Sequence, residues 1–276
     1  MSATPPAVSG PAGIDFHTFV SEAVGATDFS TGLGIFKPGT LLPCHTHPIS
    51  EAITVVEGRA HLTVQDRAYR LNPHDCAHIP AGVPHLVRND DPSRDLVTHS
   101  AFASARPARE PIAEMLPVED RGLGDPSRSD PETITRFAKA TVYELSENAF
   151  FTDLFARRFG AVGICGGYGR FLPGASLPCH THEYDESISI VRGTATCMVQ
   201  GRRYELSGCA TAYIPKGLPH RFINTSNQEM AMIWVYAGDE PDRQVVDNRF
   251  CSGLLPWTSA PLPDAKILPN KQPGQL

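Results

Sequence analysis

The sequence contains one long segment twice, at a constant offset of 135 residues. Residues 32–89 align with residues 167–224 without a gap, and 28 of these 58 positions are identical. A repeat of this length is too long for one unit of a solenoid and about the size of a whole domain. The chain of 276 residues is therefore expected to form two domains of the same fold, each large enough to bury a core.

Each copy of the repeat shows the pattern of short β-strands. Residues 52–56 and 187–191 are rich in β-branched side chains, and a glycine, Gly58 or Gly193, follows each run. Similar runs recur about every 8 to 12 residues between turns, which use many of the 25 prolines and 23 glycines. The spacing predicts an all-β sandwich or barrel in each copy.

The composition outside the repeats predicts the domain boundaries. Proline-rich and polar stretches flank the two copies and separate them. Pro131 also predicts a short helix that continues to Lys139, because proline is favoured at the first helical position. We expect a flexible arm at 1–13, an N-terminal barrel at 14–104, a linker at 105–135, a C-terminal barrel at 136–238 and a proline-rich tail at 239–276.

Each copy also carries three histidines and one glutamate in a spacing that suits a metal site. Side chains alternate along a strand, so a His-x-His pair points both imidazoles to one face. A glutamate four residues after the second histidine falls on the same face if the strand or a tight turn continues the register. The third histidine follows a turn containing proline and glycine. Three imidazoles and a carboxylate suit Fe, Mn, Co, Ni, Zn or Cu. The candidate ligands are His45, His47, Glu51 and His85 in the first copy, and His180, His182, Glu186 and His220 in the second.

The spacing of these residues resembles the two signature motifs of the cupin superfamily. The first motif is a glycine, five residues, His-x-His, three residues, Glu, six residues and Gly; the second is Pro-x-Gly-x-x-His-x-x-x-Asn. Both occur in each copy, although the glycine that usually opens the second motif is His74 or Cys209. From about Phe16 to Gly238 the chain resembles a bicupin. The resemblance implies two tandem jelly-roll barrels holding up to two divalent metals per chain, expected to be Fe(II), with Mn, Ni, Co, Zn or Cu as alternatives.

Residues in register with the ligand glutamates are expected to line an apolar substrate cavity. They are Ile53 and Val55 in the first copy and Ile188 and Ile190 in the second, with Tyr184 at the mouth of the second site. Such a lining suits a small organic substrate that chelates the metal through oxygen atoms. The first hypothesis is a dioxygenase that acts on an enol, diketone, phenol or flavonoid-like compound. The alternatives are a non-oxidative isomerase, lyase or hydrolase, and a binding or regulatory protein without turnover.

Three further histidines distinguish the two copies. His61, His78 and His99 occur only in the first copy; at the same offset the second has Thr196, Tyr213 and Trp234. We interpret these histidines as structural residues. The asymmetry predicts that the two cavities differ in polarity, so that one is catalytic and the other structural.

The seven cysteines predict reduced thiols. Their number is odd and no Cys-x-x-Cys occurs, which argues against a disulfide framework. Cys44 and Cys179 each precede a candidate ligand histidine, and alternation along the strand points them away from the metal. We expect both to be small buried hydrophobic residues.

Charge and hydropathy narrow the expected partners. The net charge of -6 and the pI of about 6.0 give no basic surface for nucleic acid. No apolar run of about 18 residues predicts a membrane span, and the first residues do not resemble a signal peptide, so a cytoplasmic protein is expected. The expected partners are a small-molecule substrate, dioxygen for the first hypothesis, and a second copy of the chain in a homodimer, with a monomer as the alternative.

Overall fold

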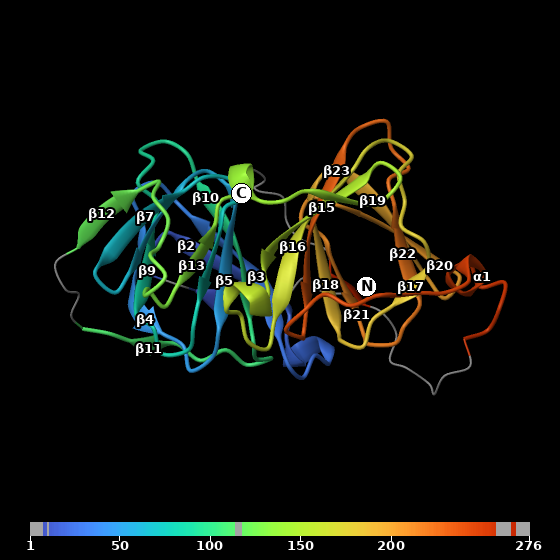
Figure 1. The fold of residues 1–276 in the computed structure, drawn as a ribbon, viewed down its shortest axis with the longest axis horizontal. Coiled ribbons are helices and arrows are strands. Elements are labelled where there is room, and N and C mark those ends of the chain that lie inside the picture. The colour runs from blue at the N-terminus through green and yellow to red at the C-terminus, as the bar shows by residue number, and fades with distance from the viewer. Residues whose placement is uncertain (1–7, 10, 114–117, 258–265, 269–276) are drawn as a thin grey trace. The chain divides into compact units, whose positions relative to one another are not determined.

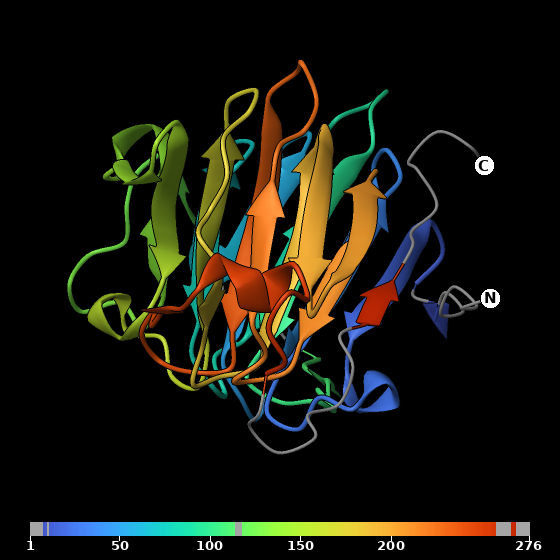
Figure 2. The same cartoon turned by 90° about the vertical axis from the view of Figure 1, so that its right-hand side faces the viewer.

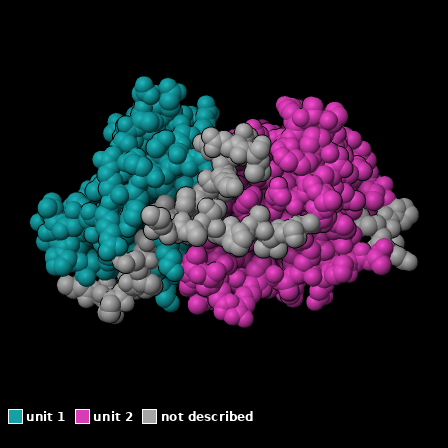
Figure 3. Space-filling view, turned by 180° about the vertical axis from the view of Figure 1, so that it is seen from behind, with its two compact units in different colours: residues 1–4, 141–153, 166–276 teal, residues 5–140, 154–165 magenta. Residues whose placement is uncertain are grey.

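The computed structural model describes residues 8–9, 11–113, 118–257 and 266–268, which form two all-β units (Figure 1). One unit comprises Pro5–Ala140 and Leu154–Cys165, and the other contains Thr141–Asp153 and Gly166–Leu276 (Figure 3). We call them the N-terminal and the C-terminal barrel. The predicted all-β fold with two tandem barrels is confirmed.

The N-terminal barrel is built from two sheets around one apolar core. The larger sheet contains, in spatial order, β1 (Val8–Ser9), β2 (Ile14–Val20), β3 (Ser30–Phe36), β10 (Leu96–Phe102), β5 (Glu51–Glu57), β8 (Cys76–Ile79) and β13 (Thr133–Thr135). The second sheet contains β11 (Glu110–Pro111), β4 (Leu41–Thr46), β9 (His85–Arg88), β6 (Ala60–Val64), β7 (Arg67–Leu71) and β12 (Glu119–Gly122). The core cluster takes residues from both sheets, such as Ile53 from β5 and Leu62 from β6.

The C-terminal barrel repeats this arrangement. Its larger sheet contains β14 (Tyr143–Ser146), β15 (Ala149–Phe155), β16 (Cys165–Phe171), β23 (Met230–Tyr236), β18 (Glu186–Arg192), β21 (Thr211–Ile214) and β25 (Lys266–Leu268). The second sheet contains β20 (Arg202–Ser207), β19 (Thr194–Val199), β22 (His220–Ile223), β17 (His180–Thr181) and β24 (Gln244–Val245). The short helix α1 (Asn248–Cys251) lies beside β19 and β22 (Figure 2).

The segment that separates the two repeats adds strands to the N-terminal barrel. Within 105–135, expected to be a linker, β11 pairs with β4, β12 with β7 and β13 with β8. The helix predicted from Pro131 to Lys139 is wrong: these residues form β13 and the 3-10 turn η2 (Phe137–Lys139). The two remaining 3-10 turns are η1 (Glu22–Val24) and η3 (Arg157–Phe159).

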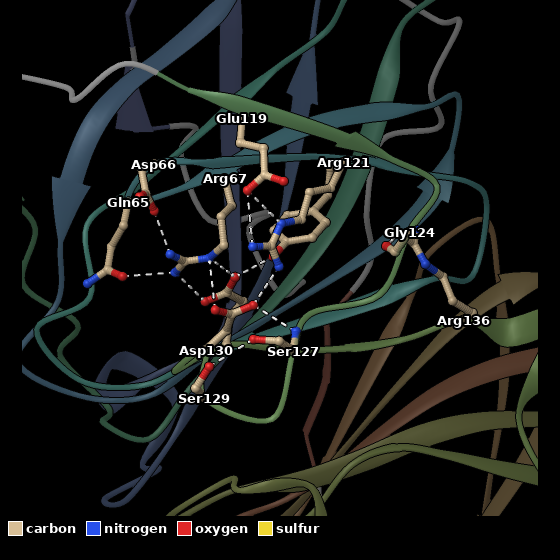
Figure 4. A network of polar contacts seen from close by, with 12 residues as sticks. Gln65, Asp66, Arg67, Glu119, Arg121, Gly124, Ser127, Ser129, Asp130 and Arg136 are labelled. Atoms are coloured by element: carbon tan, nitrogen blue, oxygen red, sulfur yellow. Dashed lines mark hydrogen bonds and ion pairs between the residues drawn. The ribbon is translucent and has the colours of Figure 1, made fainter.

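A buried ion pair explains why this segment is extended rather than helical. Arg67 donates from Nε to Glu132 Oε1 over 2.8 Å and from Nη2 to Oε2 over 2.9 Å. The Tyr69 hydroxyl donates to the same carboxylate over 2.7 Å, and the Glu132 side chain is fully buried. Next to it, Asp130 accepts hydrogen bonds from Arg121 and from the Ser127 backbone (Figure 4). These charge-assisted contacts hold residues 130–136 against β7 and β8.

Both chain ends contribute short strands. In the expected arm at 1–13, β1 pairs with β2, and residues 1–7 and 10 lie outside the described residues. In the tail, β24 pairs with β17 and β25 with β21, while 258–265 and 269–276 lie outside the described residues. Among the helices of the described part of the chain, none is long and apolar enough to cross a membrane.

The two barrels differ by one residue in the loop that follows the second motif. Asn89 Nδ2 donates to the Arg94 carbonyl, whereas Asn224 Nδ2 donates to the carbonyl of Gln228, so the second loop is one residue shorter. In the strands that follow these loops, corresponding residues of the two copies are therefore 134 positions apart rather than 135. In agreement, Phe102 pairs with Glu51 and Tyr236 with Glu186.

This shift corrects one predicted correspondence. By register with the ligand strands, Ser100 is opposite Ile53 and Trp234 is opposite Ile188, so Trp234 replaces Ser100. His99 corresponds to Ile233 and not to Trp234, because His99 is opposite Thr54 and Ile233 is opposite Ser189. The serine-to-tryptophan difference lies on the inner face of the barrel, where it changes the cavity.

The turn that opens the second motif needs a left-handed backbone. His74 has φ of 72° and Cys209 has φ of 64°, a region that residues other than glycine rarely adopt. The cupin pattern usually has glycine at this position, and this chain makes the same turn without it.

His78 is a buried structural histidine of the N-terminal barrel. Its exposed fraction is 2%, and neither ring nitrogen has a hydrogen-bond partner among the described residues. Burial lowers the pKa of His78 to about 4, because the imidazolium would lose its hydration. The unfolded chain takes up a proton near pH 6.5, where the folded chain does not.

We therefore expect His78→Leu to reduce the acid sensitivity of the protein. The unfolded state binds the extra proton between about pH 6.5 and 4, so this histidine lowers the free energy of unfolding as the pH falls, by about 2 kcal/mol at pH 5. Urea denaturation of wild type and variant at pH 7 and pH 5 measures the difference. Protonation of the metal ligands changes the free energy of unfolding equally in both proteins and cancels in the comparison. An equal loss of stability in both proteins at pH 5 would contradict the assignment.

Candidate metal centres

The structure brings the four candidate ligands of the first copy together inside the N-terminal barrel. His45 lies on β4, Glu51 begins β5 and His85 begins β9, while His47 follows β4 directly. One ligand atom from each of the four residues lies within 4.8 Å of the others, and all four side chains are buried. The carboxylate Oε2 of Glu51 is 3.0 Å from His85 Nε2 and 3.3 Å from His47 Nε2. His45 and His85 come from the second sheet and Glu51 from the larger sheet, so the set forms where the two sheets face each other across the barrel.

The C-terminal barrel holds the equivalent set in a slightly looser arrangement. Ligand atoms of His180, His182 and His220 lie within 4.8 Å of one another. Glu186 joins them through Oε2, which is 2.8 Å from His220 Nε2 and 3.5 Å from His182 Nε2. The hydroxyl of Tyr236 also hydrogen-bonds to Glu186, a contact that Phe102 at the equivalent position cannot make.

Every candidate ligand histidine has its second ring nitrogen fixed by a backbone carbonyl. In the first site the Nδ1 atoms of His45, His47 and His85 contact the carbonyls of Pro43, Ala108 and Val83. In the second site those of His180, His182 and His220 contact Pro178, Asp242 and Leu218, over 2.8, 2.5 and 2.9 Å. A carbonyl only accepts, so Nδ1 carries the proton and Nε2 presents a lone pair to the centre.

The pKa values of the candidate ligands favour the binding of a cation. Burial lowers the pKa of His45 to about 4 and that of His180 well below its usual range. Burial alone would raise the pKa of Glu51, but the neighbouring imidazoles of His47 and His85 hold it well below its ordinary value. The pKa of His47 is raised: burial opposes this, but the adjacent Glu51 carboxylate and the Ala108 carbonyl outweigh it. An ionised carboxylate beside imidazoles favours a cation between them.

These residues fit a divalent metal ion. Four buried atoms at the two centres have no hydrogen-bond partner: His47 Nε2, His182 Nε2, His220 Nε2 and Glu186 Oε2. Unsatisfied buried polar atoms are costly, and a metal held by imidazole nitrogens and a carboxylate would satisfy them. Each barrel therefore contains one candidate His/Glu metal site.

The cavities above the two sites differ in size and lining. The N-terminal cavity has a volume of about 290 Å³ and reaches from the ligands past Ile53, Val87, Ser100 and Phe102 to Arg109. The C-terminal cavity has a volume of about 160 Å³ and is narrowed by aromatic side chains, among them Trp234 and Tyr236. A cavity serving a drug-sized ligand usually measures about 300–1,000 Å³, so only the first approaches that range.

Two of the five predicted substrate residues line the cavities. Ile53 lines the N-terminal cavity and Ile188 the C-terminal one. Val55 and Ile190, two residues further along the same strands, are fully buried in the barrel cores and are not among the described lining residues. Tyr184 packs against Gly238, where a Cβ atom would meet its ring at 2.5 Å. It is not among the described lining residues either.

Sequence reasoning missed the segment that closes each site. After the last strand of the repeat, residues 107–111 and 241–245 run along the ligand strands, where β11 pairs with β4 and β24 with β17. We call these two segments straps. They supply the carbonyl that accepts from the second histidine and then an arginine, Arg109 or Arg243, that lines the cavity. The tripeptide Pro-x-Arg occurs in both straps, at 107–109 and 241–243, and this repeat could have revealed them in the sequence.

The prediction that all thiols are reduced is wrong for one pair. Cys179 and Cys251 form a disulfide with a Cα–Cα distance of 5.9 Å, and the other five cysteines are buried and form no disulfide. The pair escaped prediction because Cys251 lies 72 residues away, in a helix outside the repeat. Cys44 is buried and free, as predicted. His61 contacts Asp90 at the protein surface, away from both sites.

Comparison with known proteins places this architecture in a family. A family model described as Cupin domain matches residues 32–101 and 167–236. The chain is 32% identical over 99 residues to the polyketide synthase CurC of Streptomyces cyaneus, covering 35% of this chain and 64% of that protein. It is 23% identical over 274 residues to quercetin 2,3-dioxygenase of Bacillus subtilis, covering 84% of this chain and 80% of that one.

Solved structures of two oxalate decarboxylases share the fold. That of Bacillus subtilis superimposes with a TM-score of 0.70 at 14% identity, over 87% of this chain and 76% of that chain. That of Lactobacillus farciminis, in a formate complex, gives 0.71 at 15% identity, over 87% and 85%. Since the Cupin domain model matches both barrels, this chain belongs to the cupin family and is a bicupin with two candidate metal sites.

Proposed function

We propose that this bicupin is a non-haem, metal-dependent dioxygenase that acts on a small enol, diketone, phenol or flavonoid-like compound in its N-terminal cavity. The observation that carries the proposal is the position of the complete His45, His47, Glu51 and His85 set in the wall of a largely apolar cavity of about 290 Å³. The similarity to quercetin 2,3-dioxygenase over 84% of the chain supports the oxidative reaction class.

The four ligands would hold Fe(II) or a similar divalent ion. Such an ion would bind an oxygen atom of the substrate and activate dioxygen beside it. The residues of the chain provide the surroundings for this chemistry. The carbonyls of Pro43, Ala108 and Val83 accept from Nδ1 of the three imidazoles, which favours the tautomer whose Nε2 lone pair points inward.

The cavity walls position the substrate and exclude water. Ile53, Val87 and Phe102 present apolar surface around the ligands, and the Phe102 ring lies 5.0 Å from the ring of His47. An apolar wall favours a substrate with an apolar or aromatic body whose oxygen atoms face the metal ligands.

Arg109 supplies a positive charge at the mouth of the same cavity. The pKa of His45, lowered mainly by burial, is lowered further by this charge, so the guanidinium acts on the ligand cluster. Its carbon Cζ lies 5.0 Å from the ring centre of Phe16, which holds the side chain over the cavity. A fixed cation there stabilises the negative oxygen of an enolate or phenolate and favours the ionised form of the substrate.

The C-terminal site suits a structural role better than turnover of such a substrate. Trp234 occupies the position of Ser100, and the remaining volume is about 160 Å³. We propose that this site stabilises the second barrel while the N-terminal cavity carries out the reaction.

Metal analysis and oxygen uptake test the proposed function. Protein purified without a metal-affinity tag or chelator should contain close to two metal equivalents per chain, mainly iron. It should consume dioxygen in step with loss of a diketone, phenol or flavonol. Turnover without oxygen uptake would instead indicate an isomerase, lyase or hydrolase. Metal binding without turnover of any of these compounds would indicate a binding protein.

A further inference from the structure

The C-terminal cavity contains two buried hydrogen-bond donors without a partner. They are Nη1 of Arg243 and Nε1 of Trp234, and both residues line the cavity. An indole N–H and a guanidinium N–H can only donate, so each needs an acceptor. Leaving a buried donor unsatisfied costs about 1–3 kcal/mol, and more for a charged group. Two such donors in one cavity point to a ligand that accepts hydrogen bonds.

Backbone structure fixes the positions of both donors. Trp234 lies in the middle of β23 opposite Ile188, and its ring packs so closely on β16 that a Cβ atom at Gly167 would meet it at 2.6 Å. Arg243 is held by the strap: the Asp242 carbonyl accepts from His182, and Gln244 pairs with Thr181. The indole is thus part of the packed wall of the cavity, and the backbone on both sides of Arg243 is held against the ligand strand.

The charge of Arg243 is not neutralised by a protein carboxylate. No ion pair of Arg243 occurs within the described residues, although Asp242 is its neighbour in sequence. The Asp242 carboxylate accepts from the Glu183 backbone through Oδ2 and lies 3.8 Å from His182 through Oδ1. The Nη1 donor of Arg243, which pairs with no carboxylate of the described residues, favours an anionic acceptor over a neutral one.

The size and remaining lining of the cavity limit the anion. Its volume of about 160 Å³ excludes most organic ligands. Away from the strap the wall is apolar, with Phe151, Phe222 and Met232. A carboxylate with a short hydrocarbon tail matches both parts of this lining. Its two oxygen atoms can accept from the guanidinium of Arg243, and its tail contacts the apolar wall.

We propose that the C-terminal cavity is a binding site for a small monocarboxylate anion, held by Arg243 and Trp234. The site is separate from the reaction proposed for the N-terminal cavity and does not depend on it. In the N-terminal cavity Ser100 replaces the tryptophan, so the same pair of donors does not exist there.

Tryptophan fluorescence of the metal-loaded full chain tests the site. The chain has two tryptophans, so Trp257→Phe leaves Trp234 as the only indole and as a local reporter. Titration with sodium acetate at constant ionic strength should give a saturable change in emission. In this background Arg243→Gln should raise the acetate dissociation constant about tenfold or more, since it removes a charged donor. The matched variant Arg109→Gln, in the other barrel, should leave it unchanged.

Further variants and ligands distinguish binding at this site from non-specific effects of acetate. Trp234→Phe, measured by calorimetry, should weaken acetate binding about fivefold. Arg243→Lys keeps the charge and should bind acetate more tightly than Arg243→Gln. If the glutamine variant loses metal or folds poorly, the acetate affinity of Arg243→Lys is compared with that of wild type instead. No saturation by acetate, equal effects of Arg109→Gln and Arg243→Gln, or equal binding of the bulky benzoate would overturn the proposal. Tighter binding of inorganic phosphate than of acetate would also overturn the proposal.

Discussion

His85→Ala is expected to reduce oxygen-dependent turnover by more than about 100-fold, whereas His220→Ala should leave it within about threefold of wild type. Loss of an outer partner of a metal ligand already costs about 10- to 100-fold, so loss of a ligand should cost more. His85 Nε2 is 3.0 Å from the Glu51 carboxylate in the cavity that we propose for the substrate. His220 holds the same position in the smaller cavity, which Trp234 narrows.

This pair of variants is matched in chemistry and position. Each should lose about one metal equivalent per chain by elemental analysis, so metal loss alone does not explain a difference in activity. Unfolding temperatures show whether either barrel is disrupted. Equal loss of turnover in both variants, with both folded, would contradict the division into a catalytic and a structural site.

The sequence was sufficient for the barrels and for the convergence of the candidate ligands. A gap-free repeat with fixed His-x-His and Glu positions identified the ligands by their spacing, although Glu51 lies on β5 of the larger sheet and not on the strand face of His45. The third histidine could be added because it follows a turn that each copy repeats. The structure brings His45, His47, Glu51 and His85 together as this spacing predicts.

Other features depended on contacts that no local pattern encodes. The pairing of the straps with the ligand strands joins residues about 60 positions apart, as in the contact of His182 with Asp242. The exchange of Ser100 for Trp234 was hidden because a loop shorter by one residue shifts the alignment of the last strand. Residues 131–139 were predicted to be helical because the partner of Glu132, Arg67, lies 65 residues earlier.

Cys251→Ser is expected to lower the free energy of unfolding of the C-terminal barrel by about 4 kcal/mol. Cys179 and Cys251 close a loop with a sequence separation of 72, and chain entropy in the unfolded state gives roughly that stabilisation for such a loop. Denaturant unfolding measures the effect, and a reducing agent should reproduce it in wild type. Cys44→Ala, which changes the free counterpart of Cys179 in the first barrel, should cost at most about 1 kcal/mol.

The disulfide should also affect the second metal site, because it joins α1 to the residue before His180. Cys179 further accepts from the Val246 backbone and donates to Asn248 Oδ1, so the cysteines, the strap and α1 form one connected unit. Cys251→Ser should therefore weaken metal retention by the C-terminal site and leave the N-terminal site unchanged. A thiol count of five in denatured wild type would agree with the bond, since five cysteines are free. A count of seven would show that both cysteines are reduced, as the predicted cytoplasmic location would favour, and the loss of stability in Cys251→Ser would then be small.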